Sequence, residues 1–186
     1  MRIIAGSARG RRIVAPAGQS TRPITDRAKE GIFNMLVSLG GVADARVLDL
    51  YAGSGSFGLE SLSRGADHVT FVERGRPALA ALGKNLQTLG FESRATVLGV
   101  SVEQALITLA SSSFDLVFCD PPYADDPWTA LLERVPAPLL VGHASSEIPL
   151  ATGWLEVRRR SYGRAQVLVA ERDASGGVNS PRRADA

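Results

Sequence analysis

The chain has 186 residues, of which 45% are hydrophobic and 22% charged, with one cysteine and a net charge of +2. This length suits one domain with short appendages, and the composition is typical of a soluble protein with a buried core. No stretch reaches the roughly 20 consecutive apolar residues that cross a membrane, and no secretory signal is evident, so we expect a cytoplasmic protein. The cysteine count excludes an internal disulfide and a cysteine-rich zinc site, and no metal site is predicted.

The positive charge is concentrated near the N-terminal end. Residues 1–30 contain seven Lys and Arg against two Asp and Glu, a net charge of +5, whereas the other residues sum to −3. Such an asymmetry predicts a polyanionic partner that approaches from one end. A solvated basic segment would give the same pattern and is the alternative.

Residues 1–20 form a predicted basic arm. Two strand-like runs, residues 2–5 and 11–15, flank a segment with Gly6 and Gly10, which predicts a small β-hairpin. The chain then stays extended through Pro23 and enters a helix predicted over residues 26–39. Thr25 is the expected N-cap of this helix, and Gly40-Gly41 is its expected end.

From residue 46 onward, apolar runs alternate with amphipathic stretches, the pattern of a parallel sheet with helices on both faces. Strands are predicted at residues 46–51, 68–73, 95–99, 114–119 and 139–141, and helices at 57–64, 77–89, 102–110 and 126–135. Two further strands, 154–161 and 165–170, are too close for a crossover helix, so the last strand must run antiparallel to its neighbour. The predicted domain spans residues 21–172, and a polar, disordered tail follows at 173–186.

A glycine loop follows the first predicted strand. Gly53, Gly55 and Gly58 have G-x-G-x-x-G spacing between a strand and a helix, and Glu73 follows 20 residues after Gly53 at the end of the second strand. An acid at that place can accept hydrogen bonds from ribose hydroxyls. The combination predicts a nucleoside-containing cofactor; a glycine turn beside a surface glutamate is the alternative.

Asp49 is an ionisable residue within the otherwise apolar first strand. Its charge suits a cationic ligand group, such as the amino-acid end of S-adenosylmethionine. Alternatively, Asp49 caps backbone N–H groups of its own loop, and both interpretations can hold together. A nicotinamide cofactor is less favoured, because this chain has little to spare for a substrate-binding region.

The tetrapeptide Asp120-Pro121-Pro122-Tyr123 follows the fourth predicted strand. An exocyclic amine on a nucleobase is a poor nucleophile, because its lone pair is delocalised into the ring. Asp120 and the Pro121 carbonyl can each accept one N–H and leave the lone pair directed at a methyl donor. The prolines restrict the backbone, and Tyr123 can stack on an extruded base. In isolation, the tetrapeptide would more often be a turn.

A tetrapeptide of this kind downstream of a glycine-rich loop resembles the amino-methyltransferases of the S-adenosylmethionine-dependent superfamily. Further motifs over nearly the whole chain resemble the RsmD family, the bacterial 16S rRNA guanine-N2 methyltransferases. These motifs are Arg2-Ile3-Ile4-Ala5-Gly6, Arg9-Gly10-Arg11, Thr21-Arg22-Pro23, Asp26-Arg27, Glu30, Phe33-Asn34, Ala52-Gly53-Ser54-Gly55, Gly58-Leu59-Glu60 and Ser63-Arg64-Gly65-Ala66.

The resemblance implies an α/β fold with a Rossmann-like seven-stranded methyltransferase sheet, mostly parallel with an antiparallel last strand, preceded by the basic hairpin. It implies methyl transfer from S-adenosylmethionine to the N2 amine of one guanine of 16S rRNA, in the small ribosomal subunit or an assembly intermediate. We expect a monomer.

The resemblance also assigns roles to residues by position. Cofactor contacts are expected from Asp49, Tyr51, Ala52, Gly53, Ser54, Gly55, Gly58, Glu73, Arg74, Ser101 and Val102. The target base is expected at Asp120, Pro121, Pro122 and Tyr123, and RNA contacts at Arg9, Arg11, Arg12, Arg22 and Arg27. The superfamily often places an acid near Ser101, so this chain, which has serine there, is expected to offer a backbone contact.

Several alternatives stay open at this point. The same tetrapeptide serves methylases of DNA adenine and protein glutamine, and a catalytically silent RNA-binding assembly factor could keep the fold. Both histidines, His68 and His143, lie away from the motifs and are expected to be structural. The run 158–160 with Arg164 is either a second RNA-facing patch or the solvated face of a hairpin.

Overall fold

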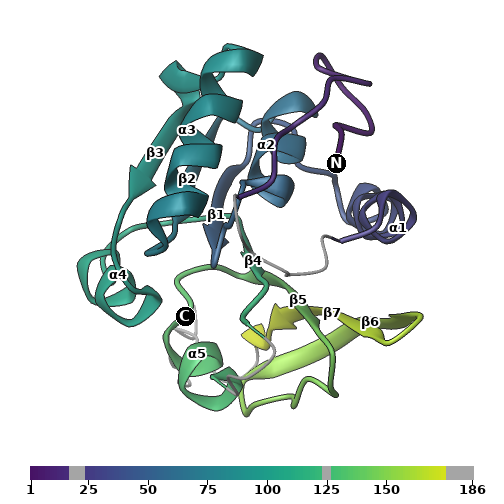
Figure 1. The fold of residues 1–186 in the computed structure, drawn as a ribbon. Helices are drawn as coiled ribbons and strands as arrows, with labels where there is room; N and C mark the ends of the chain where they lie inside the picture. Colours follow the sequence, from purple (N-terminus) through teal and green to yellow (C-terminus); the bar gives the residue numbers. More distant parts are fainter. Residues whose placement is uncertain (17–23, 123–126, 175–186) are drawn as a thin grey trace, which may run out of the picture.

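The computed structural model describes residues 1–16, 24–122 and 127–174 (Figure 1). The helices are α1 (Asp26–Val37), α2 (Ser56–Ser63), α3 (Arg76–Leu89), α4 (Val102–Thr108) and α5 (Trp128–Arg134), with one 3₁₀ turn at Glu92–Arg94. The strands are β1 (Arg46–Leu50), β2 (His68–Val72), β3 (Ala95–Leu98), β4 (Leu116–Cys119), β5 (Leu139–Ala144), β6 (Trp154–Tyr162) and β7 (Ala165–Arg172). Within these ranges, no helix has the length and apolar content to cross a membrane. Of the predicted tail, only Asp173 and Ala174 lie among the described residues.

The strands form one seven-stranded sheet in the order β3-β2-β1-β4-β5-β7-β6. Strands β1 to β5 pair in parallel, and β7 is antiparallel to both β5 and β6. The predicted fold class is therefore confirmed, including the antiparallel last strand. The strand order reverses between β1 and β4, so the loops that follow these two strands meet at one edge of the sheet.

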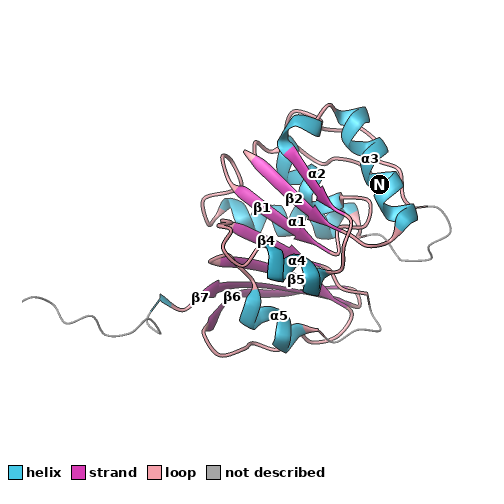
Figure 2. Cartoon of the chain, turned by 90° about the vertical axis from the view of Figure 1, so that its left-hand side faces the viewer, coloured by secondary structure: helices cyan, strands magenta, loops and turns pink. Residues whose placement is uncertain are grey.

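Helices cover both faces of the sheet (Figure 2). Core residues of α1, α2 and α3 pack on one face, and those of α4 and α5 pack on the other. Phe118 and Cys119 of β4 point into opposite cores, and Phe118 stacks on Phe57 with 4.8 Å between ring centroids. Burial on both faces explains why this strand is a continuous apolar run in the sequence.

Helix α1 begins where the sequence predicts. The Thr25 side-chain oxygen accepts a hydrogen bond from the Ala28 N–H at 3.2 Å, as an N-cap does. The helix ends at Val37, two residues before the predicted boundary, and Gly40 and Gly41 follow with φ of +101° and +80°. Both values lie in the left-handed region, which glycine adopts without strain.

Strand β5 is longer than predicted. It extends to Ala144 instead of ending at residue 141, because every residue from Leu139 to Ala144 pairs with β7. The extension includes His143, which therefore lies at the same sheet edge as the end of β4.

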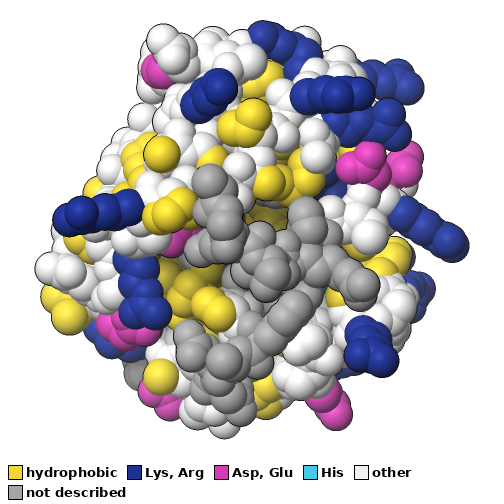
Figure 3. All heavy atoms as spheres, in the orientation of Figure 1, with side chains coloured by type: hydrophobic (Ala, Val, Ile, Leu, Met, Phe, Trp, Pro, Cys, Tyr) yellow, Lys and Arg dark blue, Asp and Glu magenta, His cyan; other side chains and the backbone are white. Residues whose placement is uncertain are grey.

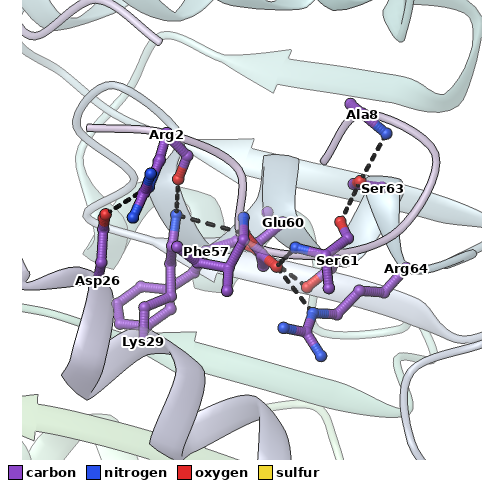
Figure 4. Close-up of polar contacts among 12 residues, drawn as sticks. Arg2, Ala8, Asp26, Lys29, Phe57, Glu60, Ser61, Ser63 and Arg64 are labelled. Atoms are coloured by element: carbon purple, nitrogen blue, oxygen red, sulfur yellow. Dashed lines mark hydrogen bonds and ion pairs between the residues drawn. The ribbon is translucent and has the colours of Figure 1, made fainter. Parts of the chain in front are cut away.

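The predicted hairpin of the arm is present, but its pairing is shorter than the two predicted strands. The described arm, residues 1–16, folds back through one antiparallel bridge, Arg2 with Arg12, and three backbone hydrogen bonds of 2.9 to 3.2 Å join its two limbs. The backbone N–H groups of Ile4 and Ala5 donate to the Glu60 carboxylate of α2 at 2.8 and 3.0 Å. Because a side chain takes up these two donors, they do not extend the pairing between the two limbs, and the arm lies along α2 as a strap (Figure 4).

A buried charge cluster holds this strap. Glu60 has no exposed surface, and its oxygens lie 3.3 Å from Lys29 Nζ of α1 and 2.8 Å from Arg64 Nε. Lys29 Nζ also donates to the Arg2 carbonyl at 2.7 Å (Figure 4). Burial lowers the pKa of Lys29, while the nearby Glu60 charge acts in the opposite direction. Glu60 thus joins the arm, α1 and α2 at one point.

Candidate active site

A cavity of about 350 Å³ lies among the segments that follow β1, β2, β3 and β4. This is the edge at which open α/β sheets bind ligands. The lining residues are Met1, Ala15, Pro16, Ile24, Tyr51, Ala52, Gly53, Ser54, Ser56, Val72, Glu73, Arg74, Gly75, Val100, Ser101, Val102, Glu103, Asp120, Pro121 and Pro122.

The three glycines of the loop have different surroundings. Gly53 lines the cavity with φ of +57°, and no atom lies within 4 Å of the place where a Cβ would be. A Cβ at Gly55 would lie 2.6 Å from Leu82, and one at Gly58 would lie 2.2 Å from the Phe71 ring. Gly53 therefore leaves room beside the cavity, whereas Gly55 and Gly58, which do not line it, let α2 pack closely on α3 and β2.

Glu73 holds the loop and faces the cavity. Its Oε2 accepts the Gly53 N–H at 2.9 Å, and its Oε1 accepts the Gly75 N–H at 2.6 Å. A carboxylate has about four acceptor positions, so Glu73 retains capacity for ligand hydroxyls.

Asp49 caps its own loop. Its side chain is almost fully buried, does not line the cavity, and accepts the Gly58 N–H at 2.9 Å through Oδ2. Burial raises the pKa of Asp49 well above its ordinary value, the Gly58 hydrogen bond opposes this, and the Asp120 and Glu73 charges add to it. An ionised Asp49 is therefore costly in the absence of a nearby cation.

Asp120 lies at the end of β4 with its side chain 33% exposed, and it contacts His143. The distance from Asp120 Oδ1 to His143 Nδ1 is 2.7 Å. The expectation that His143 is unrelated to the motifs is wrong. Strands β4 and β5 pair Cys119 with Gly142, and the residues that follow these two in sequence are Asp120 and His143. The other histidine, His68, lies at the start of β2 and contacts Thr96 at 2.9 Å.

Pro121 is buried and Pro122 exposed, and both line the cavity beside Asp120. Tyr123 of the tetrapeptide and Arg22 of the basic set lie outside the described residues. The structure thus brings the first three residues of the tetrapeptide to the same cavity as the glycine loop.

The segment after β3 closes another side of the cavity. Arg74, Ser101 and Val102 line it, in agreement with their predicted place, and Ser101 caps α4 by accepting the Gln104 N–H at 3.3 Å. Glu103 also lines the cavity, although the sequence did not predict it as a site residue. A hydrogen bond with Ser101 lowers the pKa of Glu103. The signal that could have found it is an acid two residues after Ser101.

Ser56, at the start of α2, was also missed. Its Oγ is the one buried side-chain polar atom without a hydrogen-bond partner in the described part of the chain, and the residue lines the cavity. The orphan hydroxyl, the space beside Gly53 and the free acceptor capacity of Glu73 together fit a ligand with several polar groups. A nucleoside-containing methyl donor meets this description.

The arm forms part of the cavity wall through Met1, Ala15 and Pro16, and Ile24, which precedes α1, lines the same wall. Asn85 of α3 joins this wall to the glycine loop. Its Oδ1 accepts the Val14 N–H at 2.8 Å, and its Nδ2 donates to the Val14 and Ser54 carbonyls at 3.0 Å each. The same side chain thereby positions the arm and the loop.

The basic residues lie on the outside of the arm and α1. Arg9, Arg12 and Arg27 are exposed, and Arg11 is exposed but donates to the Thr88 carbonyl at the end of α3. Figure 3 shows Lys and Arg side chains gathered over the arm and α1. The described part of the predicted RNA-binding set therefore shares one side of the molecule.

The run 158–160 of β6 divides between two faces. Arg158 and Arg160 pair with Val169 and Val167, which belong to the α1–α3 core face. Arg159 donates twice to the Ile148 carbonyl at 3.1 Å and pairs with Glu156 at 2.9 Å. Of the three arginines, only Arg158 and Arg160 are exposed on the side that carries α1.

The chain matches the family model described as "Conserved hypothetical protein 95" over residues 1–171. The chain belongs to this family. A proposed rRNA methyltransferase of Bacillus subtilis, YlbH, is 46% identical over 138 residues, which cover 73% of each chain. Ribosomal RNA small subunit methyltransferase D of Haemophilus influenzae is 36% identical over 174 residues, which cover 88% of this chain and 89% of the relative.

Among solved structures, a proposed methyltransferase of Escherichia coli, yhhF, superposes with a TM-score of 0.77 at 33% identity. The match covers 94% of this chain and 98% of the E. coli chain. The family predicted from the motifs is thus confirmed, and so is the enzyme class: the protein is an S-adenosylmethionine-dependent methyltransferase.

Proposed function

We propose that the protein transfers the methyl group of S-adenosylmethionine to the exocyclic N2 amine of a guanine in small-subunit ribosomal RNA. The observation that carries this proposal is the meeting of Asp120, Pro121 and Pro122 with the glycine loop and Glu73 around one cavity. The names of the relatives from B. subtilis and H. influenzae support RNA as the substrate class.

The side chains of the cavity suggest how the donor is held. Glu73 would accept the ribose hydroxyls, Gly53 would let the ligand approach the backbone, and Ser56 would use its unpaired hydroxyl. Asp49 would favour the cationic amino-acid end through its charge. Tyr51, Ala52, Ser54, Arg74, Ser101 and Val102 complete the proposed contacts, and Gly55 and Gly58 support the loop from behind.

When bound, S-adenosylmethionine supplies an electrophilic methyl group on a sulfonium centre. The Asp120 carboxylate and the Pro121 carbonyl are proposed to accept the two N–H groups of the target amine. The rigid Pro-Pro backbone would hold the Pro121 carbonyl before the base arrives, so little orientation entropy is lost at reaction. The overall reaction replaces one amine hydrogen with a methyl group and releases one proton. Tyr123 is the proposed stacking partner of the base.

The basic side of the molecule supports a nucleic acid over a protein glutamine as substrate. Arg9, Arg12 and Arg27 would contact phosphates, together with Arg11 and Arg22. In this proposal residues 1–20 are an RNA-binding element that precedes the methyltransferase domain. The domain spans residues 21–172, and residues 173–186 are an appended tail. The proposed partner is 16S rRNA within the small subunit or an assembly intermediate, methylated in the cytoplasm by a monomer.

The test is transfer of label from radioactive S-adenosylmethionine. Undermethylated small subunits, free 16S rRNA, duplex DNA and a cytosolic protein fraction are incubated separately with the enzyme, and labelled RNA is digested to nucleosides. We expect label in N2-methylguanosine, with subunits or assembly intermediates the better substrate. Label confined to DNA or protein would contradict the proposal.

An Asp120→Ala variant separates catalysis from binding in the same assay. Loss of the acceptor should reduce methyl transfer below detection, while the donor Kd stays within a few-fold, because Asp120 meets the amine and not the ribose. A catalytically silent assembly factor would show no transfer in the unaltered protein either. Unchanged transfer by the variant would refute the role of Asp120.

A further inference from the structure

The strongest unassigned feature is the contact between Asp120 and His143. Their 2.7 Å separation is that of a charge-assisted hydrogen bond. His143 is 4% exposed, whereas Asp120 is open to the cavity, so the histidine approaches the carboxylate from the protein interior. None of the motifs or family names described above assigns a role to His143.

The sheet and an aromatic pair constrain the position of the imidazole. His143 lies within β5, where its backbone pairs with Val167 of β7. The ring packs edge-on against Phe57 of α2, with 6.3 Å between ring centroids. Phe57 in turn stacks on Phe118 of β4, two residues before Asp120. The imidazole is therefore held by the sheet on one side and an aromatic pair on another.

A carboxylate oxygen only accepts hydrogen bonds, so the proton between Asp120 Oδ1 and His143 Nδ1 belongs to the nitrogen when Asp120 is ionised. Oδ1 is thereby engaged by the histidine, which leaves Oδ2 for a ligand in the cavity that Asp120 lines. We infer that His143 is a positioning residue that holds the Asp120 carboxylate through Oδ1 so that Oδ2 faces the target amine. This inference rests on the proposed function for the identity of that amine.

The test compares two variants. His143→Leu removes the hydrogen-bond donor to Asp120, whereas the side-chain amide N–H of His143→Asn replaces Nδ1–H. His68→Leu is the matched control, since His68 lies on β2, on the other side of β1 and β4 from His143. For His143→Leu we expect the single-turnover rate to fall about 10–100-fold, by analogy with the loss seen when a residue that orients a metal-binding side chain is removed. The Kd values for donor and RNA should change by less than about threefold, since binding energy lies in other contacts.

For His143→Asn we expect recovery to within about fivefold of the unaltered rate, because the hydrogen-bond donor returns. Equal losses in the Leu and Asn variants, or a full rate in the Leu variant, would overturn the inference. If His143→Leu does not fold, His143→Gln takes its place, because its longer amide cannot match Nδ1 and should lose rate where Asn does not.

A spectroscopic measurement tests the contact without any substrate. Long-range ¹H–¹⁵N correlation of the unaltered protein should show the His143 proton on Nδ1, and Asp120→Ala should change the Nδ1 and Nε2 shifts. A ring with an unprotonated Nδ1, or one indifferent to Asp120→Ala, would overturn the inference. Failure of rRNA methylation by the unaltered protein would instead contradict the proposed function and leave this result to stand.

Discussion

Asp49 combines two properties that oppose each other, an almost complete loss of solvent and a negative charge at the loop that would hold the donor. Because its pKa in the folded protein lies above the ordinary 3.8, the folded state keeps the proton to higher pH than the unfolded chain does. Ionised Asp49 therefore lowers the free energy of unfolding. The cost is absent below the unfolded pKa and is complete above the folded one.

Asp49→Asn should remove this cost and retain the acceptor for the Gly58 N–H. Without ligand, we expect the free energy of unfolding of the natural protein to fall relative to that of the variant as pH rises from about 4. The total fall should be about 1.4 kcal/mol for each unit by which the folded pKa of Asp49 exceeds the unfolded one. Urea denaturation at several pH values measures the difference. The variant should also bind the cationic donor more weakly; parallel stability curves together with unchanged donor affinity would count against both roles.

At the residue scale, the sequence located Glu73, Asp120 and the glycine loop because each follows the end of an apolar strand. It could not locate His143, because that requires the register of β4 against β5, and Gly142 interrupts the apolar run before it. Ser56 and Glu103 were missed for a related reason. Their place at the cavity depends on how α2 and α4 begin, which periodicity does not specify to one residue.

At the scale of elements, the arm and α2 explain several family motifs as structure. A Cβ on Gly6 would lie 1.8 Å from the Ser63 carbonyl oxygen, so only glycine lets the arm lie against α2. Ser63 Oγ donates to the Ala5 carbonyl at 2.6 Å and accepts the Ala8 N–H at 3.0 Å. The hairpin is shorter than predicted because these partners, and Glu60, lie more than 50 residues away in sequence.

Glu60→Gln is expected to loosen this strap. It leaves Lys29 buried without its counter-ion, a change that costs about 3–5 kcal/mol in comparable buried pairs. Equilibrium urea denaturation measures the loss. Arg2→Ala is the control, because the Arg2–Asp26 pair is exposed and such pairs contribute about 0–1 kcal/mol. Similar losses in the two variants would show that the buried cluster is not the anchor.

Asn85→Ala tests the link between the arm and the glycine loop. The variant loses three hydrogen bonds, to Val14 and Ser54, so both segments should become less well held. We expect a donor Kd raised several-fold and faster cleavage by trypsin at Arg11 and Arg12. Gln87→Ala, at an exposed position of the same helix, should change neither. Faster cleavage with an unchanged Kd would separate the arm from donor binding.

At the scale of the whole molecule, the alternation of apolar runs and helices was sufficient for the sheet, its crossovers and its antiparallel last strand, because burial on two faces dictates that pattern. The uneven charge of the sequence appears in the folded protein as Lys and Arg side chains gathered over the arm and α1 (Figure 3). A count of charges does not show to which face of the sheet each arginine side chain points. Within the run 158–160, alternation along β6 sends Arg159 to the other face.

If the basic side tracks an RNA backbone, its contribution must depend on salt. Replacing Arg9, Arg11 and Arg12 with alanine should weaken RNA binding and reduce the slope of log K against log salt concentration by roughly one unit for each phosphate that the arm no longer neutralises. Filter binding from low to moderate salt measures the slope. When only Arg9 and Arg12 are replaced, the affinity for S-adenosylmethionine should not change, since neither residue lines the cavity.

Two further variants give that slope its meaning. Arg134→Ala on α5, within the opposite helix layer, should leave it unaltered. A variant of Arg158, Arg160 and Arg164 reports on β6 and its turn: a lowered slope would extend the RNA surface beyond α1, and an unaltered one would identify these residues as a solvated face. An unchanged slope in the arm variant would show that the arm does not bind RNA. The slope reports counterion release on contact with phosphates, and the packing of the arm against α2 does not affect it.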